Sequence, residues 1–388
     1  MLRRYRDAMQ VERRTDGRTR AERWQAMPGW VEAVAIAVVS RAFSLAVLFG
    51  AWALRLPPTS FKPVDNPLVI WDAQWYSFIA HNGYHADAVV KTQYGPGLHD
   101  FAFFPAWPML VKAVSLDNRL PIDTVAPILA NLLFVLATVS IFSILERVGG
   151  RSVARWGLAL FAFGPASYVY SLGYSEPLFL LFVSRFFVSI EEQPTTSSSL
   201  RSAVLAMGTQ LVRVTGAALA FASLPDLLDR ETRRRGFLII GGSIVAFAAW
   251  WTWIALLTHN PTGYLLGTPS WFLNFQPTPI PTGIASLGYA DVPMSFVAVI
   301  LIALLALGTR WVARRGELRL ALFCFACLAS TMLDTQTTMP RLASVAFPAF
   351  GGLAALLPST RWRALALATF IGAQVVIAAY TVRRLLVP

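Results

Sequence analysis

LVIWDAQWYSFIAHNGYH, residues 68–85, and FAFFPAWPML, residues 101–110, stand between two apolar runs that are each long enough to cross a membrane. A loop that only joins two helices needs a handful of residues. The segment that contains both stretches also carries acidic and imidazole side chains, namely Asp72, Asp87, Asp100, His81, His85 and His99. Its many Trp, Tyr and Phe residues suit a bilayer interface. We therefore expect the chemistry of the protein in this segment.

The composition of the chain is that of a membrane protein. Of its 388 residues, 56% are hydrophobic and 14% are charged, and the mean hydropathy is +0.54. Soluble domains carry about 25% charged residues. Repeated apolar runs of about 20 residues predict an all-α polytopic membrane protein. The net charge of +12 does not indicate nucleic acid as a partner, because the arginines cluster beside the apolar runs, as in proteins whose helices are oriented by basic loops.

The charge pattern predicts a basic cytoplasmic tail, residues 1–29, followed by a single transmembrane domain, residues 30–388. With the tail inside, residues 30–54 cross outward and residues 55–120 form a first external loop. Residues 259–291 are rich in Pro, Gly and Trp and predict a second long external loop. We expect about ten spans in the plasma membrane. The uncommon polar residues then gather on the external face, where we expect the active site.

Residues 203–224 do not fit a simple crossing, because the polar linker before them and the cluster of arginines after them are both predicted on the cytoplasmic side. Gly208, Arg213 and Gly216 interrupt the apolar run. The pattern predicts two half-helices that enter and leave the same face, which occurs where broken helices are buried or line a cavity. A charge at this depth is expensive, so Arg213 is expected to face a polar partner.

Asp72 lies near the start of a helix-like stretch, where its charge would be favoured by the helix dipole. It is either a catalytic base or a residue that caps the helix. His81 and His85 have the spacing of two metal ligands on one helix. However, Gly83 stands between them and no Glu accompanies them. Anchoring of the loop is therefore favoured, and neither a metal nor a cofactor is predicted.

Three further places each have a functional and a structural interpretation. Tyr174-Ser175-Glu176-Pro177 is typical of a helix start, but its carboxylate is also suited to bind sugar hydroxyls. Arg341 either clamps a lipid phosphate or extends along the membrane to the interface. Cys324 and Cys327 have redox spacing but lack a second pair or a nearby His, which favours packing on one helix face.

The order of several short motifs resembles the PIG-V family of dolichyl-phosphate-mannose-type mannosyltransferases. The first are Trp71-Asp72-x-x-Trp75 with Ile79-Ala80-x-x-Gly83-Tyr84, and then Phe103-Phe104-Pro105-x-x-Pro108. They are followed by Asn131-Leu132-Leu133, Phe163-x-Pro165, Tyr174-Ser175-Glu176 and Arg213-x-x-Gly216, with an echo at Pro340-Arg341. Each motif is short, and their order over residues 68–220 makes the resemblance specific.

The resemblance implies a GT-C glycosyltransferase fold, in which juxtamembrane helices form part of the first external loop. It implies polyprenyl-phosphate-mannose as donor and Asp72 as catalytic base. The scarcity of lysine relative to arginine suggests a bacterial source, so we expect an envelope glycolipid or glycan as acceptor. For the donor phosphate we expect Arg341 and Arg213. The expected substrate contacts are Trp71, Gln74, Trp75, His81, His85, Tyr174 and Glu176.

Two alternatives remain open from the sequence. A flippase or transporter for lipid-linked sugars also needs many spans and buried charge. It would line a path through the membrane with polar residues, whereas the pattern here gathers them on one face. A non-catalytic subunit of a glycosylation complex would be inert when purified alone.

Overall fold

The computed structural model describes residues 28–58, 64–90, 98–265, 292–331 and 339–385. Within these ranges the chain is helical and forms no strand, which confirms the predicted all-α class; one antiparallel bridge joins Val90 to Leu98. Almost all of the predicted basic tail, residues 1–29, lies outside the described residues. So do the predicted second external loop from residue 266 onward and residues 334–338 of the segment before Arg341.

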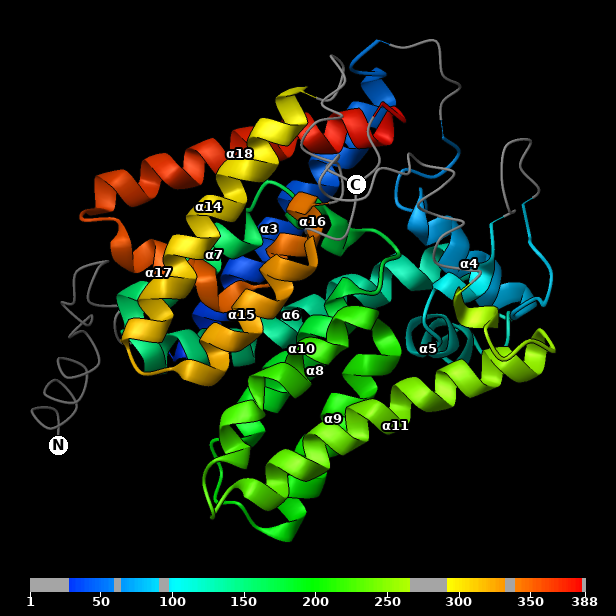
Figure 1. Ribbon diagram of the computed structural model, residues 1–388. Helices are drawn as coiled ribbons and strands as arrows, with labels where there is room; N and C mark the ends of the chain where they lie inside the picture. The colour runs from blue at the N-terminus through cyan, green and yellow to red at the C-terminus, as the bar shows by residue number, and fades with distance from the viewer. Residues whose placement is uncertain (1–27, 59–63, 91–97, 266–291, 332–338, 386–388) are drawn as a thin grey trace, which may run out of the picture.

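Figure 1 shows the helices packed together in a bundle. In chain order they are α3 (Gly29–Leu54), α4 (Asp72–Asn82), η1 (Asp100–Ala102), α5 (Ala106–Val114), α6 (Ile122–Gly149), α7 (Arg151–Ala162), η2 (Ser167–Ser171), α8 (Glu176–Ser189), α9 (Thr196–Val212), η3 (Val214–Gly216), α10 (Ala217–Ala222), η4 (Leu224–Leu227), α11 (Arg233–Leu257), α14 (Val292–Arg314), α15 (Leu318–Thr331), α16 (Met339–Ser344), α17 (Phe347–Leu356) and α18 (Thr360–Val382).

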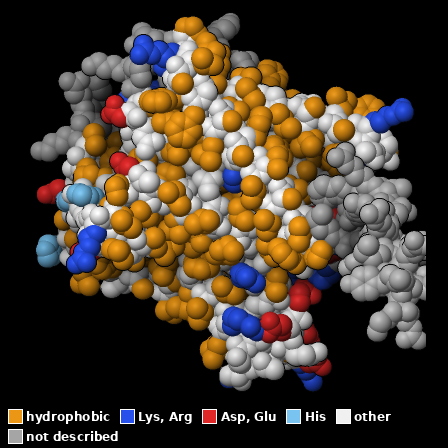
Figure 2. Space-filling model, turned by 180° about the vertical axis from the view of Figure 1, so that it is seen from behind, with side chains coloured by type: hydrophobic (Ala, Val, Ile, Leu, Met, Phe, Trp, Pro, Cys, Tyr) orange, Lys and Arg blue, Asp and Glu red, His pale blue; other side chains and the backbone are white. Residues whose placement is uncertain are grey.

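Among the described residues, five helices are long and apolar enough to cross a membrane: α3, α6, α11, the Phe296–Arg314 part of α14, and α18. They coincide with predicted spans. Figure 2 shows apolar side chains over a broad area of one face, with charged side chains mostly towards its margins. Such a surface suits lipid tails, which accept apolar side chains without cost. The protein is therefore a multi-pass membrane protein.

The expected crossing over residues 156–172 is not one continuous helix. The helix α7 ends at Ala162, before Gly164 and Pro165, and a separate 3-10 turn, η2, follows. Proline disfavours helix in the residue before it, which explains the break. The buried guanidinium of Arg41, on α3, donates to the carbonyl oxygens of Ala162 at 3.0 Å and Ser167 at 2.7 Å. It thereby satisfies backbone groups that the broken helix leaves unpaired.

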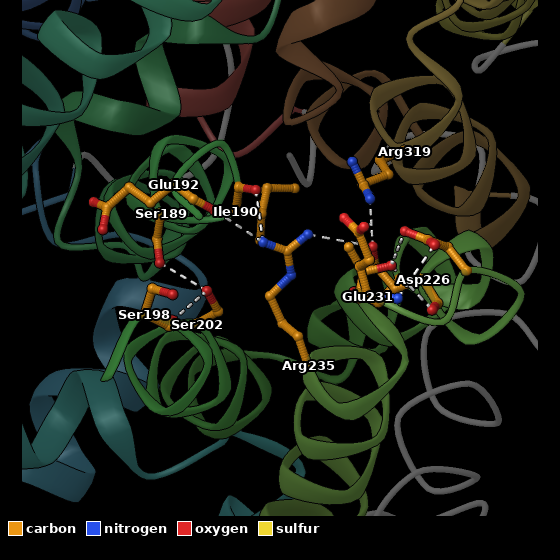
Figure 3. Close-up of polar contacts among 12 residues, drawn as sticks. Ser189, Ile190, Glu192, Ser198, Ser202, Asp226, Glu231, Arg235 and Arg319 are labelled. Carbon is orange, nitrogen blue, oxygen red and sulfur yellow. Dashed lines mark hydrogen bonds and ion pairs between the residues drawn. The ribbon is translucent and has the colours of Figure 1, made fainter. Parts of the chain in front are cut away.

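The predicted pair of half-helices over residues 203–224 is confirmed. The first half, α9, ends at Val212, Arg213 is extended, and η3, α10 and η4 lead back to the starting face. Figure 3 shows the two ends of this excursion meeting at the start of α11. Ser202 of α9 bonds Ser189 at 2.7 Å, and Asp226 of η4 pairs with the buried Arg235 at 3.4 Å.

Arg235 also fixes the far end of α8. Its Nη1 donates to the carbonyl oxygen of Ile190 at 2.9 Å, and Asp226 pairs in addition with Arg319 of α15 (Figure 3). A helix of 14 residues is about 21 Å long. Glu176 is the first residue of α8, so this polar cluster lies one helix length away from it. The end of α8 away from Glu176 is thus held by a hydrogen bond from Arg235, which is itself paired with Asp226.

Glycines let α17 approach α7 and α14 closely. A Cβ at Gly157 of α7 would lie 2.7 Å from the Cα of Gly351, and one at Gly308 of α14 would overlap the carbonyl oxygen of Ala349. Small residues at such contacts allow membrane helices to pack backbone against backbone. The free cysteines Cys324 and Cys327 are buried on α15, in agreement with the packing interpretation.

We expect Gly308→Ala to destabilise the protein by about 1–3 kcal/mol, because the added methyl group must push two helices apart. Gly372→Ala is the matched control, since a Cβ at Gly372 of α18 meets nothing within 4 Å. It should be neutral or stabilising by up to about 1 kcal/mol. Thermal unfolding in detergent measures both. Equal melting temperatures for the two variants would contradict the close packing of α14 on α17.

Candidate active site

The helix α4 begins at Asp72, directly after a strained residue. Trp71 has φ 53° and ψ −122°, a combination that strongly favours glycine. Such outliers cost about 1–3 kcal/mol and occur mostly at functional sites. Asp72 occupies the first helical position, directly after this strained residue. Its carboxylate pairs with Arg341. The capping interpretation is wrong, because the cap position is Trp71 and no side chain bonds the helix end.

A chain of four charged groups forms the centre of the site. Nη1 of Arg341 lies 2.6 Å from Oδ2 of Asp72, and Nε of the same guanidinium donates to Glu176. Glu176 also pairs with Arg213. The guanidinium carbon of Arg341 lies 4.4 Å from the ring centre of Tyr174, as in a cation–π contact. Arg341 is therefore held on three sides.

The four groups come together because each stands where a helix begins, breaks or turns. Asp72 and Glu176 are the first residues of α4 and α8, where the helix dipole favours a negative charge. Arg213 is the extended residue between α9 and η3, as expected for a charged residue at a helix break. The partner predicted for Arg213 is thus confirmed. Arg341 belongs to the short helix α16 and is only 5% exposed, so it does not extend to the membrane surface.

The burial of the two carboxylates differs strongly. The side chain of Glu176 is 1% exposed, whereas that of Asp72 is 24% exposed. One oxygen of Glu176, Oε2, and the hydroxyl of Tyr174 are buried without a hydrogen-bond partner among the described residues. Buried polar groups are nearly always paired. These two atoms are therefore suited to bind polar groups of a ligand.

Tyr76 is a neighbour of the site that the sequence did not single out. It follows Asp72 by four positions, so both side chains lie on the same side of α4. Its hydroxyl lies 2.9 Å from Oγ of Ser175, the residue before α8. Burial raises the pKa of Tyr76 to about 12, so the phenol stays neutral at physiological pH. The i, i+4 spacing is the signal that would have found it.

Other predicted substrate contacts lie elsewhere on the loop. Gln74 and His81 are exposed, and Trp75 stacks on Phe103 with ring centres 5.7 Å apart. Nδ1 of His85 lies 2.8 Å from Oδ2 of Asp100, which is fully buried. Their roles in substrate binding stay predictions.

The pair formed by His85 and Asp100 joins two positions of the loop that are 15 residues apart. Burial raises the pKa of Asp100, and the hydrogen bonds from His85 oppose this shift. The contact agrees with the expected anchoring role of the histidine. Across the described ranges, no three His, Cys, Asp or Glu side chains are grouped so that they could hold a metal ion.

A family model described as Mannosyltransferase (PIG-V) matches residues 58–222. The resemblance to the PIG-V family is confirmed. The matched segment includes Asp72, Glu176 and Arg213, whereas Arg341 lies outside it. No curated protein matches the chain. The match therefore covers three of the four charged groups of the candidate site.

Solved structures of an archaeal oligosaccharyltransferase are similar in fold. The Archaeoglobus fulgidus enzyme tethered with an acceptor peptide matches with a TM-score of 0.52 and 12% identity, over 92% of this chain and 56% of that one. The same enzyme in complex with an inhibitory peptide and a dolichol-phosphate gives a TM-score of 0.47 and 11% identity, over 91% and 55% of the two chains. This chain thus spans little more than half of that enzyme. The first likeness shows the GT-C fold that the sequence predicts.

Proposed function

We propose that the protein is an inverting glycosyltransferase that moves mannose from polyprenyl-phosphate-mannose to a hydroxyl of an envelope glycolipid or glycan. The observation that carries the proposal is a partly exposed carboxylate, Asp72, on the buried Arg341, with the mostly buried Arg213 joined to the same group through Glu176. Acceptor activation needs a base, and departure of a phosphate needs cationic stabilisation. The PIG-V family match and the GT-C fold support the same class of reaction.

In the proposed reaction, Asp72 removes the proton of the acceptor hydroxyl while the hydroxyl oxygen attacks C1 of mannose. The bond between C1 and the phosphate oxygen breaks, and polyprenyl phosphate leaves with the bonding electron pair. Arg341 and Arg213 stabilise the phosphate as its charge develops. Attack from the face opposite the leaving group converts a β-linked donor into an α-mannoside. Tyr174 and Glu176 present the unpaired atoms that would bind sugar hydroxyls.

We place this reaction at the external face of the plasma membrane, with the N-terminus in the cytoplasm. The basis is the distribution of arginine beside the apolar runs. A lipid-linked donor explains why the charged groups stand inside an apolar helical bundle and at the start of a loop helix with aromatic side chains. A transporter remains less well supported, because the four charged groups converge on one end of α8 and do not line a path along it.

The proposal is tested with the purified full chain in lipid nanodiscs. Incubation with polyprenyl-phosphate-mannose and a panel of envelope lipids should yield mannosylated lipid, identified by mass spectrometry, together with polyprenyl phosphate. GDP-mannose should not replace the donor. Movement of the lipid donor across the membrane without a new glycosidic bond would favour the transporter. Complete inertness with every acceptor would favour a non-catalytic subunit.

A further inference from the structure

Arg341 is shared by two carboxylates in different environments. On one side it binds Glu176, whose side chain is 1% exposed; on the other it lies 2.6 Å from Asp72, whose side chain is 24% exposed. The first contact is closed off by protein, while the second opens towards the surface. A group that arrives from outside therefore reaches Arg341 on the side of Asp72.

We propose that the phosphate of the donor displaces Asp72 from Arg341, so that binding of the donor itself releases the base. This inference rests on the proposed function. Because Asp72 is partly exposed, water stabilises its carboxylate after separation, while the phosphate takes its place on the buried guanidinium. Breaking the buried pair with Glu176 would instead leave a charge uncompensated. A phosphate matches the planar guanidinium as well as a carboxylate does. The exchange therefore occurs at Asp72.

The charge balance of the site leads to the same conclusion. Asp72 and Glu176 carry two negative charges, and Arg213 and Arg341 carry two positive ones, so the group is neutral. Both arginines are already paired. A phosphodiester brings one additional negative charge into this largely buried site. When Asp72 leaves Arg341, the two arginines face Glu176 and the phosphate, and the inner group is again neutral.

Glu176 acts as a positioning residue in this exchange. It binds Arg213 and Nε of Arg341, while Tyr174 lies against the guanidinium at 4.4 Å. These contacts keep Arg341 in place after Asp72 has moved. A carboxylate released from an arginine has its oxygen lone pairs open to accept the hydrogen bond of the acceptor hydroxyl. Donor binding thus prepares the base for the acceptor, and departure of polyprenyl phosphate allows Asp72 to return once it has lost its proton to water.

The test measures binding of farnesyl phosphate, a polyprenyl phosphate that carries no sugar to transfer. In nanodiscs, Asp72→Asn should bind this probe about three- to tenfold more tightly than the wild type, because the competitor for Arg341 has lost its charge. Asp65→Asn is the matched control. Asp65 is an exposed aspartate of the same loop, and its replacement removes the same charge. Its affinity should stay within about twofold of the wild type.

A double-variant cycle assigns the gain to Arg341. In an Arg341→Gln background, Asp72→Asn should no longer tighten binding. An affinity of Asp72→Asn equal to or below that of the wild type would overturn the exchange, as would an equal gain in Asp65→Asn. In these cases a wild type that still binds the probe and forms product leaves the proposed function standing. A wild type that does not bind farnesyl phosphate overturns both the exchange and the lipid-phosphate donor.

Discussion

The Asp72→Asn variant is expected to transfer mannose about 10²–10⁴-fold more slowly than the wild type, because an amide cannot accept the proton of the acceptor hydroxyl. Its fold should persist, since Arg341 keeps Glu176 as a counter-ion and the amide has nearly the same shape as the carboxylate. Initial rates of mannose incorporation at saturating donor measure the effect. The loss should appear in kcat, because the base acts only in the transition state.

Two measurements separate the loss of the base from general effects. Asp65→Asn removes an exposed carboxylate from the same loop and should keep transfer within about twofold of the wild type. The melting temperature of Asp72→Asn should match that of the wild type. Near-normal turnover in Asp72→Asn would assign the base to another group, of which Glu176 is the neighbouring carboxylate on the same guanidinium.

The sequence predicted those features that depend on local chemistry. Apolar length alone located the long helices, because a bilayer demands an uninterrupted apolar stretch. Arg213 indicated a break and a polar partner, since a lone charge inside an apolar run is costly. Both expectations are met: the helix ends at Val212, and Arg213 reaches Glu176.

The meeting of distant segments could not be derived in this way. Arg341 follows Glu176 by 165 positions, and no local pattern states that α16 packs beside the start of α8. The backbone of Trp71 is likewise unpredictable, because a positive φ opposes the preference of a bulky residue and persists only through tertiary contacts. The pairing of His85 with Asp100 is a third example. Such contacts follow from packing, which a single sequence does not reveal.

The Glu176→Ala variant is expected to lose about 3–5 kcal/mol of stability, because it leaves the buried Arg341 and the mostly buried Arg213 without their shared carboxylate. Arg341 would lose one of its two carboxylate partners and keep its contact with Asp72, and Arg213 would lose its ion pair with Glu176. Unfolding by heat or denaturant in detergent micelles measures the loss. Transfer should fall as well, because the guanidinium groups are no longer held in position for the phosphate.

Glu191→Ala is the matched control for this result, because Glu191 stands just beyond the other end of α8 and its side chain is 45% exposed. Its partner Arg147 keeps a second carboxylate, that of Glu317 at 2.5 Å, so the replacement should cost about 0–1 kcal/mol. If both glutamate variants lost the same small amount, the buried network would not hold the site together. A large loss confined to Glu176→Ala would mean that one buried carboxylate fixes both arginines, and through them the base.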